Sequence, residues 1–182
     1  MPQMQRAQQL DPLSARVSNG IGRILHFERK FDQAVLQFKK TLDLDPQYAE
    51  AYFNMAMSYQ VMHRYDDGIA ALKKALALSG NRPVMVAMLG LMQGLAGRRA
   101  EAQKMYDERL ELSRKTSSSP DSYHLGLISV GLGDFDRALQ YFESAYEERD
   151  GILTYLGVDP VAESIWPNPR FAALLREMGL KD

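Results

Sequence analysis

A period of 34 residues constrains this chain more than any other feature of its sequence. Small residues recur at that interval, with a single step of 36, at Ala34, Gly68, Ala102 and Ala138. Four residues after each of them stands a large apolar residue: Phe38, Leu72, Tyr106 and Phe142. A fixed period in this range predicts stacked copies of one supersecondary unit, because a single unit cannot bury its apolar face alone.

A second set of positions repeats with the same spacing, upstream of the first. Each is a large apolar residue followed by a small one: Ile21-Gly22, Met55-Ala56, Leu89-Gly90 and Leu125-Gly126. We expect two helices in each unit, with the small residue where the two helices approach most closely. A large side chain there would overpack the unit at a cost of roughly 1–3 kcal/mol.

Apolar spacing and turn residues predict the helices themselves. The expected pairs are 14–27 with 31–43, 48–62 with 65–78, 83–95 with 98–113, and 120–131 with 135–148. Helices of about 12–15 residues are marginal in isolation, so their stability must come from packing within and between units. Residues 115–119 account for the longer step and are expected to form a loop.

The two ends of the sequence depart from the repeat. Residues 3–10 predict the second helix of a preceding unit, and we favour a chain cut from a longer protein over a native cap. In the tail, Asp159 and Pro160 stand where an apolar–Gly pair would fall. Asn168 and Pro169 predict a helix start, and an apolar stripe follows at Phe171, Leu174, Leu175 and Met178. The tail is therefore expected to end in a capping helix.

The repeated positions resemble the tetratricopeptide repeat over about residues 13–148. That repeat has a large-apolar–Gly pair, an Ala, an aromatic residue and a closing Pro. Phe31, Tyr65 and Phe135 hold the aromatic position, and Arg99 breaks it in the third unit. The resemblance implies an all-α, right-handed α-solenoid with half a unit before it and a capping helix after it. Its four helix-turn-helix repeats would span residues 12–46, 47–80, 81–114 and 115–148, between a truncated repeat at 1–11 and a tail at 149–182.

The tail carries a second resemblance. Its segments 146–150, 155–160, 168–171 and 174–180 are similar to an ending of many bacterial repeat arrays. Those arrays follow a signalling domain such as a serine/threonine kinase, a winged-helix regulator or a nucleotide cyclase. The sequence departs from that ending at residues 151–152 and 161–166. The resemblance implies the interaction region of a larger bacterial signalling or regulatory protein, although no such signalling domain is present here.

Composition excludes several classes of function. A formal net charge of −1 gives no basic surplus for a phosphate backbone, so nucleic-acid binding is disfavoured. No apolar run approaches the roughly 20 residues that span a bilayer, so no membrane contact is expected. Zero cysteines fit a reducing compartment, and we expect a cytoplasmic protein.

No set of residues predicts catalysis. The three histidines, His26, His63 and His124, fall in different units, and none has a metal-like cluster around it. The chain lacks a cysteine nucleophile, a Gly-x-Ser-x-Gly turn and a phosphate-binding loop. We therefore expect a protein that is not an enzyme and that has no catalytic residues, no metal site and no cofactor.

The resemblance implies instead a groove lined by the first helix of each repeat. Asn54 would hydrogen-bond the backbone of a bound peptide, and Arg16 with Arg23 would meet its acidic end. The expected peptide-binding residues are Arg16, Asn19, Arg23, Phe53, Asn54, Met57, Met88, Leu91, Tyr123 and Leu127. Some family members grip a C-terminal carboxylate with Lys, Asn and Arg across three units. Asn54 matches one such position, but Asn19, Val84 and Met88 do not complete the expected set, so that clamp is expected to be absent.

Several interpretations of this surface remain open. A partner protein could supply an apolar peptide or helix, or the chain's own tail could fold back and fill the groove, and the two can coexist. A self-assembly module is a further alternative, dimerising through the first helix or the Met-rich face. A small-ligand sensor is another. A protein- or peptide-binding scaffold is the favoured function.

Overall fold

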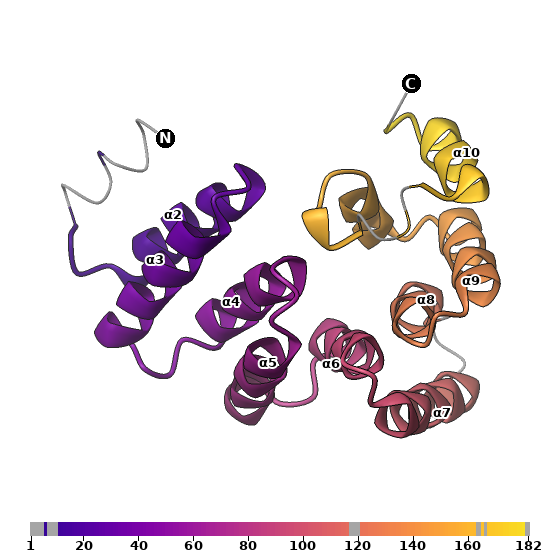
Figure 1. Ribbon diagram of the computed structural model, residues 1–182, viewed down its shortest axis with the longest axis horizontal. Coiled ribbons are helices and arrows are strands. Elements are labelled where there is room, and N and C mark those ends of the chain that lie inside the picture. Colours follow the sequence, from indigo (N-terminus) through magenta and orange to yellow (C-terminus); the bar gives the residue numbers. More distant parts are fainter. Residues whose placement is uncertain (1–5, 7–10, 117–120, 163–164, 166, 181–182) are drawn as a thin grey trace. The chain divides into compact units, whose positions relative to one another are not determined.

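The structure is a computed structural model that describes residue 6 and residues 11–116, 121–162, 165 and 167–180 (Figure 1). Every regular element in that part of the chain is helical, which confirms the all-α fold class. The predicted helix over residues 3–10 lies outside the described residues. The chain forms two compact units, Met1–Met85 and Val86–Asp182.

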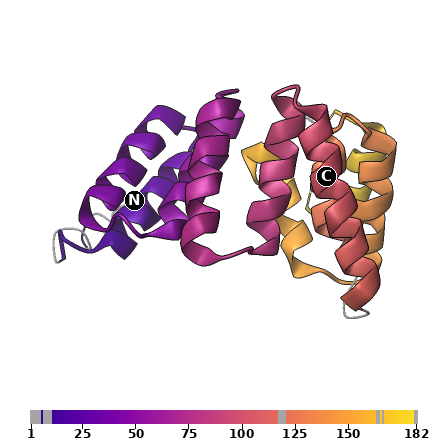
Figure 2. The ribbon, with the colours of Figure 1, turned by 90° about the horizontal axis from the view of Figure 1, so that it is seen from below.

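The first unit contains two helical hairpins. They are α2 (Ala15–Phe27) with α3 (Phe31–Leu44), and α4 (Ala49–Val61) with α5 (Tyr65–Ser79). Helix α2 packs on α3 and α4, and α4 packs on α3 and α5. The four helices lie next to one another in the indigo-to-magenta part of the ribbon (Figure 2). The second hairpin is thus stacked on the first.

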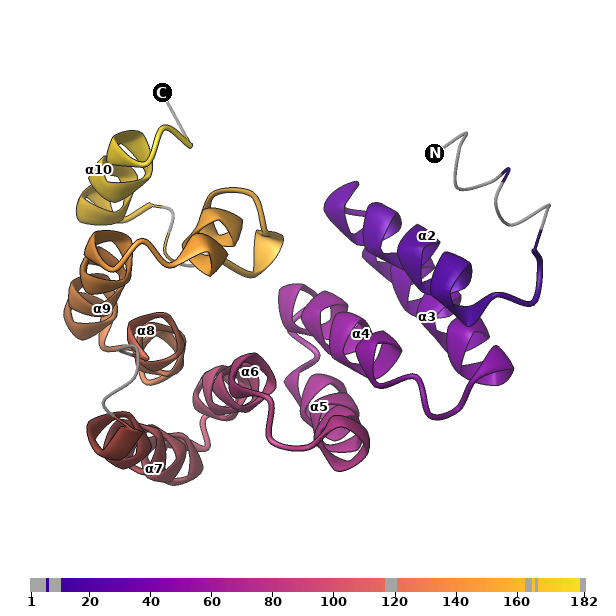
Figure 3. The same ribbon diagram turned by 180° about the vertical axis from the view of Figure 1, so that it is seen from behind.

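The second unit holds the remaining helices and the tail. Helix α6 (Pro83–Leu95) begins at the boundary and is followed by α7 (Arg99–Thr116), α8 (Ser122–Gly131) and α9 (Phe135–Glu147). The tail forms two short 3-10 helices, η1 (Gly151–Gly157) and η2 (Pro160–Ala162), and then α10 (Pro169–Glu177). Helix α8 packs on α7 and α9, and both η1 and α10 pack on α9 (Figure 3).

All eight repeat helices were predicted, and their ends agree with the prediction to within three residues. The largest difference is α7, which continues to Thr116 where the loop was expected to begin. Helix ends of this kind vary by a residue or two between definitions. The remainder of that loop, residues 117–120, lies outside the described part.

Two glycines lie where the helices of a hairpin approach most closely, as predicted. A Cβ placed on Gly22 would stand 2.4 Å from Phe38 Cε1, and one on Gly126 would stand 2.5 Å from Phe142 Cε1. Both phenylalanines are completely buried. At Gly90 the three atoms nearest to such a Cβ all belong to Ile128 of α8, the closest at 2.9 Å. The small residue at this position lets α8, the first helix of the next hairpin, approach α6 closely.

The turn inside each hairpin requires one residue with positive φ. In the second unit Gly97 and Gly133 hold that position, at φ 78° and 73°. In the first unit it is held by Arg29 at φ 61° and His63 at φ 57°. Hydrogen bonds that close each helix end accompany the turn, such as that from the Arg64 N–H to the Tyr59 carbonyl oxygen at 2.9 Å. This pattern is the Schellman motif, in which glycine is the residue without strain.

The end helix forms as its sequence predicts. The Asn168 side chain accepts hydrogen bonds from the N–H groups of Arg170 and Phe171, and Pro169 occupies the first turn. Phe171 is fully buried, with its ring centroid 6.1 Å from that of Phe142. The apolar side of α10 therefore covers the last hairpin.

Candidate peptide-binding surface

The predicted binding residues of the first unit lie on α2 and α4 and are accessible. Arg16 and Arg23 are exposed on α2. Phe53, Asn54 and Met57 are half-buried on α4. Since α2 and α4 pack on each other, their side chains contribute to one surface. We call the surface formed by Arg16, Asn19, Arg23, Phe53, Asn54 and Met57 the α2–α4 face.

A chain of hydrogen bonds fixes the polar centre of the α2–α4 face. The Asn54 Nδ2 donates to Asn19 Oδ1 at 3.1 Å, which joins the two helices. One turn further along, the Ser58 hydroxyl donates to the Asn54 carbonyl oxygen at 3.3 Å and lies 3.0 Å from His26 Nδ1. Asn19 is only 7% exposed, whereas Asn54 is half-buried. The Asn54 amide is therefore held in place while part of it stays accessible.

The charged groups of the α2–α4 face are positive. Arg16 and Arg23 are seven residues apart, close to two helical turns, so both project from the same side of α2. Neither forms an ion pair with any residue that the structure describes. The nearby acid on α4, Glu50, is paired with Arg82 at 2.8 Å. The face therefore combines two exposed guanidinium groups, a fixed amide and half-buried apolar side chains.

The predicted binding residues of the second unit are buried instead. Met88 is 2% exposed, Leu91 1%, Leu127 4% and Tyr123 7%. The close approach of α6 and α8 accounts for Leu91, because a Cβ on Gly131 would stand 2.5 Å from the Leu91 carbonyl oxygen. These four side chains could contact a partner only if the surrounding helices moved.

Tail residues lie close to Tyr123 in this unit. Burial, then the negative charges of Asp159 and Asp150, and then Tyr155 raise the pKa of Tyr123 above its usual value. All three of those residues belong to the tail or to the turn before it. In the same tail, Leu153 and Leu156 of η1 are 1% and 3% exposed. Of the predicted binding residues, Tyr123 thus has charged residues of the tail in its vicinity.

One polar cluster in the second unit was not predicted. The Asp121 carboxylate forms an ion pair with Arg109 of α7, and its Oδ1 lies 2.5 Å from His124 Nδ1. Burial and the positive charge of Arg109 lower the pKa of His124 to about 4, and Asp150 acts in the opposite direction. Neutral His124 can still donate its Nδ1–H to Asp121. The three-residue spacing of Asp121 and His124, which places two side chains next to each other on a helix, is the sequence feature that could have predicted this pair.

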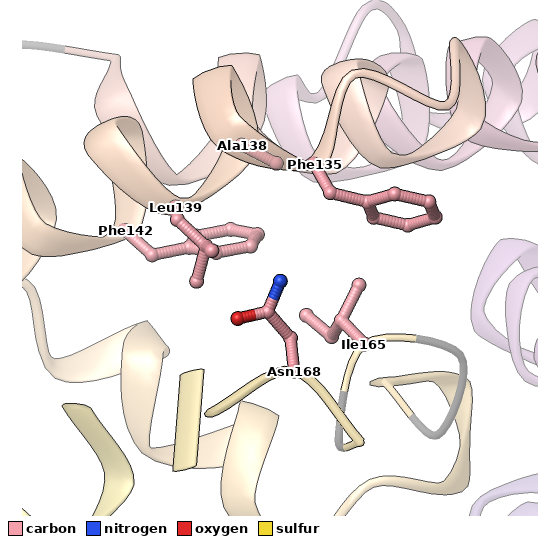
Figure 4. A pocket seen from close by; sticks show the side chains of 6 residues that line it. All are labelled: Phe135, Ala138, Leu139, Phe142, Ile165 and Asn168. Atoms are coloured by element: carbon pink, nitrogen blue, oxygen red, sulfur yellow. The ribbon is translucent and has the colours of Figure 1, made fainter. Parts of the chain in front are cut away.

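A small cavity lies between α9 and the tail in the second unit. It is lined by Phe135, Ala138, Leu139, Phe142, Ile165 and Asn168 (Figure 4). The space open to the centre of a water molecule is about 10 Å³. That volume is near the minimum for a single water. This cavity is therefore too small for a metabolite.

Neither metal nor membrane sites emerge from the described residues. Among them, no group of three or more His, Cys, Asp and Glu side chains is placed to hold a metal ion. No helix in the described part of the chain is both long and apolar enough to cross a bilayer.

Stacked helical hairpins with an accessible first-helix face define the class of helical-repeat proteins. Two segments of the chain, residues 49–82 and 122–150, match family models described as Tetratricopeptide repeat. The chain thus contains tetratricopeptide repeats, as predicted. It is 21% identical over 132 residues to the tetratricopeptide repeat-containing protein trd-1 of Caenorhabditis elegans. It is 26% identical over 117 residues to a TPR repeat-containing protein of Methanocaldococcus jannaschii. These alignments cover 72% and 64% of this chain but only 17% and 20% of the two relatives.

Solved structures show the same fold. A thermophilic TPR protein of Thermus thermophilus has a TM-score of 0.64 at 19% identity, over 82% of each chain. MamA has a TM-score of 0.58 at 24% identity, over 84% of this chain and 88% of its own. YrrB, described as a TPR protein with an unusual peptide-binding site, has a TM-score of 0.57 at 20% identity, over 96% and 97%. At these identities the likeness establishes the fold alone.

Proposed function

We propose that the chain is a protein-binding scaffold and that the α2–α4 face receives an extended or helical peptide of a partner. The observation that carries this proposal is the combination of accessible groups on that face. Phe53 and Met57 offer apolar contact, and Asn54 can hydrogen-bond a peptide backbone. Arg16 and Arg23 have no acidic partner among the described residues, and they favour a ligand with carboxylates. The peptide-binding site described for YrrB lends support at the level of the fold.

A peptide library displayed on phage and selected against the full chain tests this function directly. We expect the selected peptides to bind the wild type and to lose binding to Phe53→Glu, because a carboxylate would replace the apolar contact. Phe53 is half-buried, so the variant should keep its helicity by circular dichroism. Ala77→Glu is a matched control, since Ala77 is exposed on α5 and away from this face. Peptides that bind Phe53→Glu and wild type equally would refute the proposal.

The natural partner can then be identified by affinity capture from source-cell lysate. Wild type and Phe53→Glu are compared by mass spectrometry. A protein captured by the wild type and by Ala77→Glu, but not by Phe53→Glu, is the expected result. Equal capture by all three would place the interaction on another surface.

We also propose that the chain is the interaction region of a longer bacterial signalling or regulatory protein. The similarity of its tail to the ending of such arrays supports this context. The greater length of its two relatives is consistent with it. An immunoblot of source cells with an antibody against the chain is the test. A band well above 20.6 kDa is expected, and a band at 20.6 kDa would contradict it.

A further inference from the structure

Two hydrogen bonds set helices α2 and α4 in register. Asn54 Nδ2 donates to Asn19 Oδ1 at 3.1 Å, and Ser58 Oγ lies 3.0 Å from His26 Nδ1. Residue numbers on both helices increase from the first bond to the second, so α2 and α4 run in the same direction. Each residue of α2 can therefore be assigned a level along α4.

The two arginines of the α2–α4 face lie on either side of its fixed amide. Arg16 comes three residues before Asn19, and Arg23 comes four residues after it. Each is thus about one helical turn away from Asn19, in opposite directions, and both project from the same side of α2. With a rise of 1.5 Å per residue, the two arginines are about 10.5 Å apart along the helix axis.

Apolar side chains occupy the level between the arginines. On α4, Phe53 and Met57 stand one residue before and three residues after Asn54, and both are half-buried. A ligand that spans the α2–α4 face therefore meets a positive charge at each end. Between the charges it meets an apolar surface and one hydrogen-bonding amide.

The positive charge of the α2–α4 face is not cancelled by the acids around it. Helix α2 contains neither Asp nor Glu. Glu50 of α4, which lies near the level of Arg16, pairs with Arg82 at 2.8 Å. Glu28, the residue after α2, pairs with Lys30 at 2.8 Å. Both guanidinium groups are exposed and can therefore form charge-assisted hydrogen bonds with carboxylates of a ligand.

The fixed amide of Asn54 favours an extended ligand over a helical one. Its Nδ2 group has a second hydrogen besides the one donated to Asn19, and its Oδ1 accepts no hydrogen bond from a described residue. These two groups can bind a peptide backbone only where the peptide leaves its own N–H and C=O free. An α-helix bonds its interior backbone groups to itself. A polyproline II segment has no internal hydrogen bonds, so its backbone is available.

The separation of the arginines then sets the spacing of the carboxylates. A polyproline II helix has three residues per turn and a rise of 3.1 Å, so residues three apart share one side at a distance of about 9.3 Å. That distance is close to the axial separation of about 10.5 Å between Arg16 and Arg23. A β-strand, which rises about 3.3 Å per residue, places side chains of one side about 6.6 or 13 Å apart, a poorer match.

We propose that the α2–α4 face binds a polyproline II-like segment with two acidic residues separated by two others, at least one of them apolar. One carboxylate pairs with Arg16 and the other with Arg23. The backbone between them bonds the Asn54 amide, and the apolar residue contacts Phe53 and Met57. This ligand class rests on the proposed peptide-binding function of the α2–α4 face.

Three designed peptides test the conformation and the spacing with the full chain. The probe has the sequence Pro-Pro-Glu-Leu-Pro-Glu-Pro-Pro, with fluorescein at its N-terminus and an amide at its C-terminus, so it has no terminal carboxylate. Pro-Pro-Leu-Glu-Glu-Pro-Pro-Pro has the same composition but adjacent glutamates. The third peptide is an alanine-rich helix with two glutamates seven residues apart and a leucine between them. By fluorescence anisotropy the probe should bind at least about fivefold more tightly than either of the others, the gain of one well-placed ion pair.

Double-mutant cycles assign each carboxylate to one arginine. Arg16→Gln and Arg23→Gln are each measured with the probe and with two versions of it in which one glutamate is replaced by glutamine. Loss of one ion pair should weaken binding by about three- to fivefold. Replacement of a glutamate should have no further effect in the variant that lacks its arginine, and its full effect in the other variant. A merely structural role of the arginines would not produce this selectivity.

A matched variant controls for net charge. Lys39→Gln/Lys73→Gln removes two exposed positive charges from α3 and α5, as many as Arg16→Gln/Arg23→Gln removes from α2. It should bind the probe like the wild type, whereas the double arginine variant should bind at least about tenfold more weakly. All four replaced side chains are exposed, so helicity by circular dichroism should be unchanged.

Several results would overturn the proposed ligand class. Tighter or equal binding of the helical peptide would refute the extended conformation, and equal binding of the peptide with adjacent glutamates would refute the spacing. Failure of the wild type to bind the probe, or equal weakening by the lysine control, would refute the pairing with Arg16 and Arg23. In each case, library-selected peptides that lose binding to Phe53→Glu would still support the α2–α4 face as a peptide-binding surface. Failure of the ligand class and failure of the proposed function therefore give different results.

Discussion

The replacement Gly22→Ala tests the packing of the first hairpin with a single carbon atom. The new Cβ would stand 2.4 Å from Cε1, 2.6 Å from Cδ1 and 3.0 Å from Cζ of the Phe38 ring. Folded proteins essentially never show Cβ contacts below 3.0 Å. Phe38 is completely buried, so its ring has no solvent-filled space to enter. Either the ring or one of the two helices must move.

Two opposing effects set the magnitude. Overpacking of a buried site costs roughly 1–3 kcal/mol. Alanine in a helix interior is favoured over glycine by about 1 kcal/mol, which offsets part of that cost. A Cβ contact as short as 2.4 Å puts the overpacking cost in the upper part of that range, at about 2–3 kcal/mol. We therefore expect Gly22→Ala to lower the free energy of unfolding by about 1–2 kcal/mol. For a chain of this size the corresponding fall in Tm is about 2–8 °C.

Urea denaturation followed by circular dichroism measures this change, and a double-mutant cycle assigns it to the ring. In a Phe38→Leu background the clash is relieved, so Gly22→Ala should become neutral or stabilising. Gly126→Ala, which meets Phe142 in the same way, should behave like Gly22→Ala. An unchanged or higher stability of Gly22→Ala in the wild-type background would refute the reasoning. So would an equal cost in both backgrounds.

Three further predictions follow from burial, charge and backbone geometry. Leu91→Glu should unfold the protein or lower its free energy of unfolding by more than about 3 kcal/mol, because it places a carboxylate at a site only 1% exposed. Circular dichroism should show lost helicity for this variant but not for Phe53→Glu. A fully helical Leu91→Glu would contradict the packing described above. The pKa of His124 is lowered to about 4 in the folded chain, whereas it is near 6.5 in the unfolded chain. The contribution of neutral His124 to the free energy of unfolding is therefore fully present above pH 6.5 and is lost as the pH falls from 6.5 towards 4. This loss should amount to about 1–3 kcal/mol and should be absent in His124→Gln. Denaturant unfolding at a series of pH values measures it, and an identical pH profile for the variant and the wild type would disprove the assignment to His124. His63→Gly should raise the free energy of unfolding by about 1 kcal/mol, since glycine adopts the positive φ of 57° at this exposed turn without strain. Thermal unfolding measures the change. A lower Tm would contradict the prediction and show that the hydrogen bond of His63 to Tyr65 outweighs the strain.

Most of the fold could be predicted from the sequence because the repeat encodes it locally. Each helix has its own apolar stripe, and the 34-residue period places equivalent residues in equivalent packing. Gly22 and Gly126 stand at equivalent repeat positions, and that recurrence predicted the close approach of the two helices of a hairpin, but not that Phe38 and Phe142 would fill it. Asn168 and Pro169 likewise predicted the start of α10 from capping chemistry alone.

Side-chain exposure could not be predicted with the same success. Register alone places Leu91 and Met57 at equivalent positions, but Leu91 is buried and Met57 is half-buried. Burial of Leu91 depends on how closely Gly131 lets α8 approach α6, which is a tertiary distance. Arg99 illustrates the same limit. Its guanidinium donates a hydrogen bond at 2.5 Å to the Leu132 carbonyl oxygen at the end of α8, a role that its break in the aromatic pattern does not reveal.

The cap formed by α10 limits how this array can be lengthened. Its inner side presents Phe171, Leu174 and Leu175 to the preceding hairpin, whereas Arg176 and Glu177 are exposed. A further hairpin joined after α10 would meet charges instead of an apolar surface. Protein engineers who wish to add repeats must therefore insert them before the tail, between α9 and η1. A chain without α10 would expose the Phe142 side of α9 and invite end-to-end growth into fibres.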